Sequence, residues 1–361
     1  MSQHHDPVVI VSAARTPMGA FMSDFADLAA HDLGGAAIKA AVERAGIAPE
    51  KVDEVLFGNC LMAGQGQAPA RQAAFKGGLP KGAGAVTLSK MCGSGMKAAM
   101  MAHDMLLAGT HDVMVAGGME SMTNAPYLLQ KGRGGYRLGH DRIFDHMMLD
   151  GLEDAYEAGR SMGTFGEDCA AKYSFTREQQ DAFATASVQR AKAATESGAF
   201  AAEIVPVTVK DRSGERVVSV DEGPGKVKLE KIATLKPAFK KDGTITAASS
   251  SSINDGAAAL VMMRESTAKK LGAKPLARIV SHATHAQEPE WFATAPLGAT
   301  QKALAKAGWQ VGDVQLWEIN EAFAVVPMAL MKELDLPHDK VNVNGGACAL
   351  GHPIGASGAR I

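Results

Sequence analysis

Residues 88–97 read LSKMCGSGMK, and the cysteine of this stretch, Cys92, lies where an extended run gives way to a helix. Residues 85–88 have strand character. Residues 94–108 are rich in Ala, Met and Leu and contain no β-branched residue, which predicts a helix that ends at Gly109. Unpaired N–H groups and the helix dipole at such an N-terminus stabilise a thiolate. A cysteine at a junction of this kind is also commonly just a small buried residue, so a nucleophile needs a partner histidine.

The composition of the 361-residue chain is that of an ordinary soluble protein, with 46% hydrophobic and 21% charged residues and a net charge of -2. The sequence contains no strong basic field, no apolar run of about 18 residues and no signal-like N-terminus. We therefore expect a cytoplasmic protein without a nucleic-acid or membrane partner. The four cysteines are scattered without metal-ligand spacing, so neither a disulfide framework nor a metal site is expected.

Short apolar runs alternate with helical patterns along the first third of the chain. This alternation favours a mainly parallel sheet that is covered by helices on both faces. The expected strands are residues 8–11, 54–57, 85–88 and 113–118, and the expected helices are residues 33–44, 70–75 and 94–108.

The pattern recurs near the C-terminus. Residues 33–46, LGGAAIKAAVERAG, have a counterpart in residues 297–308, LGATQKALAKAG, and residues 314–319 then form an expected strand. The recurrence predicts two similar halves, in which the Cys92 turn corresponds to GGACALGHPIGASG at residues 345–358. We expect residues 1–120 and 248–270 to form the first half, residues 271–361 the second, and residues 121–247 an inserted loop domain.

Two residues of the second half are candidate partners of Cys92. His352 is followed by Pro353 and small residues at an expected helix start, and a histidine there can take the proton of a thiol. A histidine beside a proline is more often structural. Asn320 is expected to end the strand of residues 314–319 and to open a helix over residues 321–334, where it would serve either as an N-cap or as an amide donor to an oxyanion.

Five motifs together resemble the thiolase family, in the family's order and over almost the whole chain. Within that family the chain is most similar to short-chain acetyl-CoA acetyltransferases. The motifs are MCGSGMKA at residues 91–98, VMVAGGMESM at 113–122, INDGAAALV at 253–261, NEAFA at 320–324 and GGACALGHPIGASG at 345–358.

The resemblance implies a layered αβαβα fold of two halves and an acyl transfer that forms or cleaves acetoacetyl-CoA or a related 3-ketoacyl-CoA. In this reading Cys92 is acylated, His352 activates it, and Asn320 with His352 holds the thioester oxygen. No cofactor is implied, because the coenzyme A thioesters are substrates, and the assembly would be a homotetramer or homodimer. The residues that the resemblance places beside the substrate are Ser251, Phe239, Ala322 and Phe323, and Met162 is a further candidate for narrowing the acyl pocket.

One feature departs from the family pattern. Thiolases carry a second cysteine in a C-terminal CxGGG-type turn, which removes the α-proton of the second acetyl-CoA, and residues 1–361 contain no such motif. The sequence alone therefore predicts a truncated, incomplete C-terminal half with little condensation activity. Two alternatives stay open at this point. One is an acyl-CoA binding protein without catalysis, and the other is a ketoacyl synthase, which would normally have a second histidine in place of the NEAF stretch.

Overall fold

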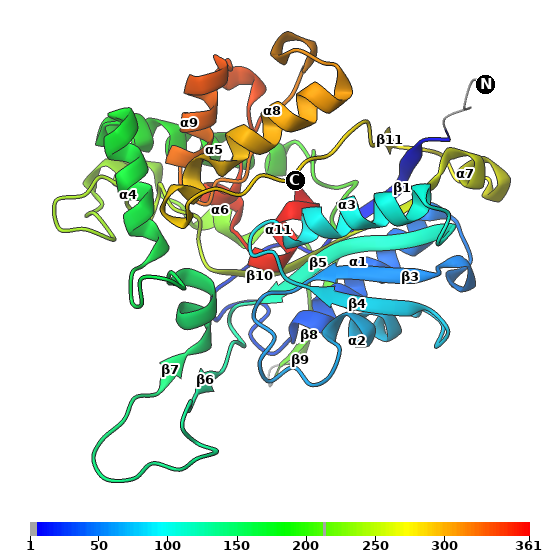
Figure 1. The fold of residues 1–361 in the computed structure, drawn as a ribbon, viewed down its shortest axis with the longest axis horizontal. Coiled ribbons are helices and arrows are strands. Elements are labelled where there is room, and N and C mark those ends of the chain that lie inside the picture. The colour runs from blue at the N-terminus through cyan, green and yellow to red at the C-terminus, as the bar shows by residue number, and fades with distance from the viewer. Residues whose placement is uncertain (1–5, 212–213) are drawn as a thin grey trace.

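A mixed sheet organises the structure, a computed structural model that describes residues 6–211 and 214–361 (Figure 1). Its strands in order across the sheet are β11 (Ala277–Arg278), β1 (Val8–Arg15), β10 (Asn254–Arg264), β5 (Val113–Ser121), β3 (Glu54–Gly58) and β4 (Gly84–Leu88), with β2 (Gly19–Ala20) paired to β10. The expected strands near residues 8, 54, 85 and 113 are all present.

The sheet is not mainly parallel, so that expectation from the sequence is wrong. Only β3 runs parallel to its neighbours, β4 and β5. Strand β10 is antiparallel to both β5 and β1, from the pair Asp255 and Ser121 to the pair Met263 and Val113 on the β5 side. The chain enters β10 after the long excursion of residues 122–253, so no short crossover helix fixes a parallel direction there.

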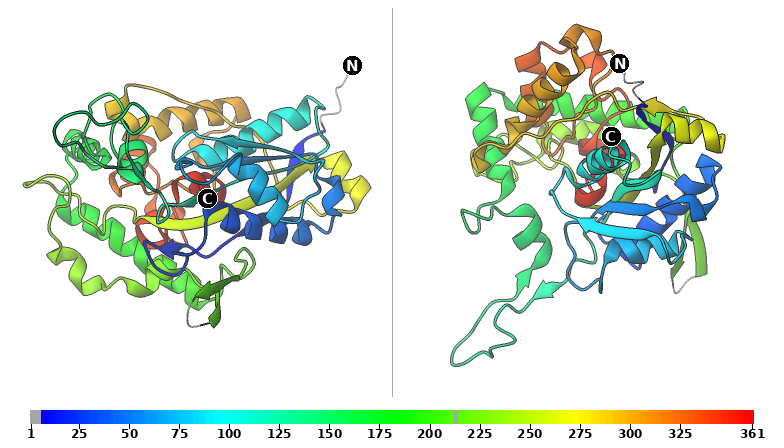
Figure 2. Two further views of the ribbon diagram at one scale, coloured as in Figure 1. Left: turned by 90° about the horizontal axis from the view of Figure 1, so that it is seen from below. Right: turned by 45° about the vertical axis from the view of Figure 1, so that its right-hand side comes forward.

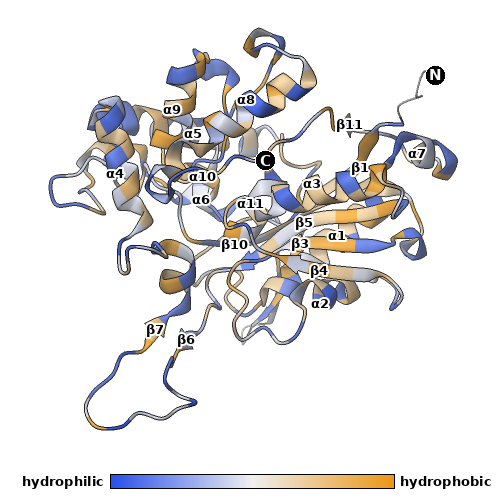
Figure 3. Ribbon diagram, in the orientation of Figure 1, coloured by the Kyte–Doolittle hydropathy of each residue, from blue (hydrophilic) through white to orange (hydrophobic). Residues whose placement is uncertain are grey.

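Helices cover both faces of the sheet, as the sequence predicted. Helices α1 (Ala30–Ala45) and α2 (Pro69–Lys76) pack on one face, and α3 (Ser94–Leu107) and α11 (Ile354–Arg360) on the other (Figures 1 and 2). The hydropathy colouring shows apolar residues concentrated on β3 and β5 between these helices (Figure 3). Each face has its own buried apolar cluster, so the strands are buried on both sides.

Close packing at glycines brings α11 onto the sheet. A Cβ atom on Gly118 of β5 would lie 1.9 Å from the carbonyl oxygen of Gly355, and one on Gly95 of α3 would lie 2.7 Å from the backbone nitrogen of Ala359. Any side chain at these positions would push α11 away from its neighbours. The glycines therefore set the distance between the Cys92 helix and the helix that follows His352.

The region between β5 and β10 holds helices and two small hairpins. Helix α5 begins with a capping box, in which Thr176 accepts from the backbone N–H of Gln179 and the Gln179 side chain binds back to the backbone of Thr176. The elements of this region are β6 (Tyr127–Leu128), β7 (Phe144–Asp145), α4 (Met162–Tyr173), α5 (Arg177–Glu196), β8 (Val207–Asp211), β9 (Gly214–Val218) and α6 (Glu222–Lys226). The loop between β6 and β7 projects away from the body of the molecule (Figures 1 and 2).

The last third of the chain is mainly helical. Its helices are α7 (Glu265–Leu271), α8 (Ala295–Ala307), α9 (Val325–Leu334), α10 (Ala347–Leu350) and α11. The strand expected over residues 314–319 is wrong for the described chain, where this segment forms one isolated bridge, between Trp317 and Val341. The reason is that the Asn342 side chain binds both the N–H and the carbonyl of Ile319, so a side chain takes the place of a strand partner.

Among the described residues, no helix is long and apolar enough to cross a membrane.

Candidate active site

A tight turn presents Cys92 just before the first turn of α3. Met91 has a positive φ of 46°, a conformation that side-chain-bearing residues adopt rarely. Ser94 holds the turn, because its hydroxyl donates to the carbonyl of Met91 at 2.6 Å and accepts from the backbone N–H of Lys90 at 2.7 Å. Cys92 is half-buried, and α3 ends one residue earlier than expected, at Leu107.

The thiol of Cys92 is not acidified by its position at the helix. Burial raises its pKa to about 11, and the negative charge of Glu120 adds to the rise, whereas a backbone hydrogen bond opposes it. The sequence-based expectation of a stabilised thiolate is therefore wrong, because desolvation outweighs the effect of the helix N-terminus. At neutral pH Cys92 is a thiol that needs a base.

His352 has the protonation state of such a base. Its Nδ1 atom lies 2.5 Å from the hydroxyl of Ser357, and that hydroxyl donates its only proton to the carbonyl of Pro353. The tautomer with its proton on Nδ1 satisfies both contacts of this hydroxyl and leaves Nε2 with a free lone pair, toward which the Asn320 amide nitrogen faces. Burial, reinforced by the charge of Arg360, lowers the pKa of His352 to about 4, so the ring is neutral at pH 7.

Asn320 faces the basic nitrogen of His352. The Nδ2 atom of Asn320 lies 3.4 Å from Nε2 of His352, and its Oδ1 atom is buried without a hydrogen-bond partner. Asn320 does not cap the following helix, which begins only at Val325 after Ala324, so the N-cap alternative is wrong. Of the three residues expected to carry the chemistry, the structure thus brings Asn320 and His352 together, with 3.4 Å between their side-chain nitrogens.

The Cys92 turn packs against the start of α11. Cys92 lies against a buried cluster that includes Ile354, two residues after His352. The Sγ atom of Cys60, in the same cluster, lies 3.4 Å from the hydroxyl of Ser94. The Cys92 turn and the turn of residues 345–358, which the sequence repeat matches with each other, are therefore neighbours. One substrate can touch both.

Glu120 joins the start of α11 to the loop at residues 59–61, and Cys60 of this loop contacts the Cys92 turn, a role that no residue pattern predicted. Its buried carboxylate accepts from the Asn59 side chain at 2.6 Å and from the backbone N–H groups of Cys60, Leu61 and Gly355 at 2.9–3.0 Å. Burial raises the pKa of Glu120, and the three backbone N–H groups oppose that rise. The only sequence signal is an acidic residue inside the apolar stretch VMVAGGMESM.

Glu321 has a comparable role in the second half. It is fully buried, and it accepts from the Ser187 hydroxyl, the Asn342 amide and the backbone N–H of Cys348 at 2.8–2.9 Å. In the sequence Glu321 is only the acidic first residue of the helix expected over residues 321–334. Instead, Glu321 directly follows Asn320 and binds the turn that carries His352, through the backbone N–H of Cys348.

The expected substrate residues gather in one apolar cluster. Phe323 is buried, the rings of Phe239 and Phe323 meet edge to face with centroids 5.6 Å apart, and Ala322 and Met162 pack against the same cluster. The half-exposed Ser251 joins this group through its backbone N–H, which donates to the carbonyl of Ala322 at 3.0 Å. Their roles toward a substrate stay predictions.

The two pKa values predict how acyl transfer to Cys92 depends on pH. Between about pH 4 and about pH 11 both the thiol and the imidazole are neutral, so lowering the pH removes the base only near 4. We expect the acid limb of the acylation rate near pH 4, not near the ordinary histidine value of about 6.5. The rate is measured by quenched-flow mass spectrometry, with circular dichroism in each buffer as the control for folding. A midpoint near 6.5 on a folded chain would contradict the environment described for His352.

Two family models match consecutive parts of the chain. The model described as "Thiolase, N-terminal domain" matches residues 8–266, and "Thiolase, C-terminal domain" matches residues 273–361. The expectation of a truncated C-terminal half is therefore not supported. It depended on one missing cysteine motif, whereas the domain match covers residues 273–361.

Similar proteins agree with these matches over nearly the full chain. A probable acetyl-CoA acyltransferase of Staphylococcus aureus (strain COL) is 47% identical over 98% of this chain and 90% of its own length. The crystal structure of the Bacillus anthracis acetyl-CoA acetyltransferase superposes with a TM-score of 0.95 at 43% identity, covering 98% of this chain and 90% of that one. Acat5 thiolase from Ascaris suum, crystallised in complex with coenzyme A, gives 0.93 at 42% identity, covering 98% and 91%. By its domain matches, its relatives and its fold, the chain belongs to the thiolase family.

Proposed function

We propose that the chain is an acetyl-CoA C-acetyltransferase, which forms or cleaves acetoacetyl-CoA or a related 3-ketoacyl-CoA through an acyl-cysteine on Cys92. One observation carries the proposal. A thiol and a neutral imidazole with a free Nε2 atom stand in turns that pack together, each just ahead of a helix. A nucleophile with a base held in one tautomer is the arrangement that covalent acyl transfer requires.

The first step follows from the protonation states. As the sulfur of Cys92 attacks the thioester carbonyl, its proton passes to Nε2 of His352. The bond between the carbonyl carbon and the sulfur of coenzyme A then breaks, and His352 returns the proton to the departing thiolate. The products are an acetylated Cys92 and free coenzyme A, so atoms and charges balance. His352 is unprotonated at neutral pH, and so able to accept the proton, because its pKa is about 4.

The oxygen of the tetrahedral intermediate needs hydrogen-bond donors. Nδ2 of Asn320 is such a donor, and Nε2 of His352 becomes a second one once it has taken the thiol proton. The two atoms are 3.4 Å apart, so one oxygen can lie within reach of both. This pairing supports the oxyanion role that the family resemblance implies for Asn320 and His352.

The apolar cluster around Phe323 supports binding of the pantetheine and acyl parts of the substrate. Phe239, Ala322 and Met162 line it, and Ser251 adjoins it. We expect Met162, which packs against this cluster, to narrow the acyl pocket in favour of a short acyl chain. A longer 3-ketoacyl-CoA is the second candidate substrate, since the S. aureus relative is named an acyltransferase.

We also propose that the active protein is a homodimer or homotetramer. Strand β4 is the outer strand of the sheet, and its Val86 side chain is 41% exposed. An uncovered edge strand with an apolar residue is a surface that another copy of the chain can pair with.

Isotope exchange between labelled free coenzyme A and unlabelled acetyl-CoA tests the function. The proposal predicts exchange without a second acyl acceptor, because acylation of Cys92 is reversible. A chain that binds acetyl-CoA in a titration but exchanges no label would instead be a binding protein, and the proposal would fall. Faster exchange with a long-chain acyl-CoA would assign the second candidate substrate.

A further inference from the structure

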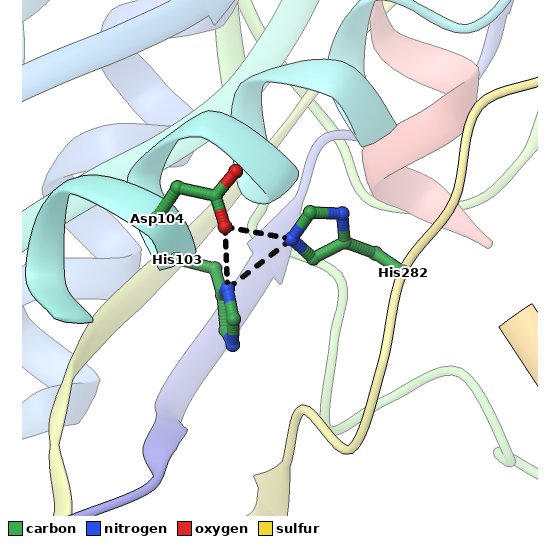
Figure 4. A group of neighbouring side chains, drawn as sticks. All are labelled: His103, Asp104 and His282. Carbon is green, nitrogen blue, oxygen red and sulfur yellow. Dashed lines mark hydrogen bonds and ion pairs between the residues drawn. The ribbon is translucent and has the colours of Figure 1, made fainter. Parts of the chain in front are cut away.

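Three side chains far from Cys92 point their polar atoms at one another (Figure 4). His103 and Asp104 are neighbours on α3, and His282 lies in the irregular segment that follows β11. The Oδ1 atom of Asp104 is 3.0 Å from Nδ1 of His103 and 2.9 Å from Nε2 of His282, and the two ring nitrogens are 3.2 Å apart. The catalytic scheme uses none of these residues.

The three distances match the edges of a metal coordination shell. A tetrahedral zinc ion holds nitrogen and carboxylate ligands at about 2.0–2.2 Å, which places the ligand atoms roughly 3.3–3.5 Å from one another. The observed triangle of 2.9–3.2 Å needs only a slight expansion to hold the ion just off its plane. The Asp104 side chain is exposed, so the fourth position is open to water.

The direction from which the rings approach also suits a metal ion. Nδ1 of His103 and Nε2 of His282 both approach the same oxygen, Oδ1 of Asp104, so three possible ligand atoms converge on one point. Each imidazole can offer its lone pair there when its hydrogen is on the other ring nitrogen.

We propose that His103, Asp104 and His282 form a site for a divalent transition-metal ion of the zinc class. Two imidazoles and one carboxylate favour zinc over magnesium or calcium, which prefer all-oxygen shells. Within the described residues 6–211 and 214–361, this is the one group of three or more such side chains close enough together to hold an ion.

The position of the site defines what the ion would do. His103 and Asp104 belong to the N-terminal thiolase domain and His282 to the C-terminal one, so the ion joins the two domains. His103 lies nine residues after Ser94, about 14 Å along α3, which is too far to touch the chemistry at Cys92. The segment of His282 also contacts α8, through Lys306 to the His282 carbonyl at 3.0 Å. The ion is therefore expected to stabilise the pairing of the domains rather than to take part in acyl transfer.

Titration of the metal-stripped protein with zinc chloride, followed by calorimetry and elemental analysis, tests the site. We expect one equivalent of zinc per chain and a higher melting temperature with zinc. His103→Gln and His282→Gln should each weaken binding by about 100-fold or more, since loss of even an outer-shell partner costs about 10–100-fold. Their acetyl-CoA exchange rates should equal that of the original chain.

Matched controls separate this site from other zinc ligands. His111→Gln removes a histidine paired with Glu54 at 2.9 Å but not part of a three-ligand group, so it should leave binding unchanged. Cys92→Ala tests the catalytic thiol, and replacement of both His4 and His5 by Ala tests the adjacent histidines of the N-terminal sequence. The proposal is overturned if the original chain binds no zinc. It is also overturned if the His103 and His282 variants still bind one equivalent of zinc, or if one of the three control variants loses it.

Discussion

Replacing His352 by Ala is expected to slow the acetylation of Cys92 by about 10²–10⁴-fold, the usual contribution of a general base. The variant leaves a thiol with a pKa of about 11 and no neighbouring acceptor for its proton. Quenched-flow intact-mass measurements with acetyl-CoA give the rate directly. The slow reaction of the variant should speed up as the pH rises toward 11, whereas that of the original chain should be flat between about pH 5 and 9.

Ser357→Ala is the graded control for this prediction. It keeps the imidazole but removes the hydroxyl that accepts from Nδ1 at 2.5 Å, so the ring is no longer held in one tautomer. We expect an effect intermediate between the original chain and His352→Ala. Equal rates for His352→Ala and the original chain, both folded by circular dichroism, would mean that another group deprotonates Cys92.

Replacing Glu120 by Ala is expected to lower the free energy of unfolding by about 3 kcal/mol or more. The carboxylate accepts four hydrogen bonds in a fully buried position, and each donor left unsatisfied costs roughly 1–3 kcal/mol. Because one of these donors is Gly355 N–H, the helix after His352 should loosen as well. Urea unfolding measures the loss of stability, and the exchange rate measures the loss of alignment.

Two variants bracket the Glu120 result. Glu120→Gln keeps one acceptor oxygen but turns an NH₂ group toward N–H donors, so it should destabilise the protein by less than Glu120→Ala. Glu43→Ala removes an exposed carboxylate paired with Lys39 on α1, and such a pair contributes about 0.5 kcal/mol at most. If Glu120→Ala were no less stable than Glu43→Ala, the junction at Glu120 would not hold the turns together.

The sequence predicted the catalytic candidates because their signals are local. The strand, turn and helix around Cys92 can be read from glycine spacing and helix propensity, and the repeat of residues 33–46 in residues 297–308 pairs that turn with the one at His352. These features predict where backbone turns occur. Within those turns, residue type alone makes Cys92 the candidate nucleophile and His352 the candidate base. The clustering of Phe239 with Phe323 came only from the family resemblance.

Long-range geometry explains what the sequence did not predict. The antiparallel direction of β10 depends on how a 132-residue excursion, residues 122–253, returns to the sheet, which no local pattern encodes. Likewise, the raised pKa of Cys92 arises from burial and from Glu120, and both exist only in the folded chain. The group of His103, Asp104 and His282 was missed because the spacing of cysteines says nothing about histidines 179 residues apart that meet after folding.

The intact mass of the chain after brief incubation with acetyl-CoA shows directly whether Cys92 is acylated, with Cys92→Ala measured in parallel and a circular-dichroism melt for both. We expect one acetyl group on the original chain, located on Cys92 by peptide mapping, and none on the variant. An unmodified original chain that binds acetyl-CoA and melts cooperatively would contradict this expectation, and so would an adduct that persists in Cys92→Ala.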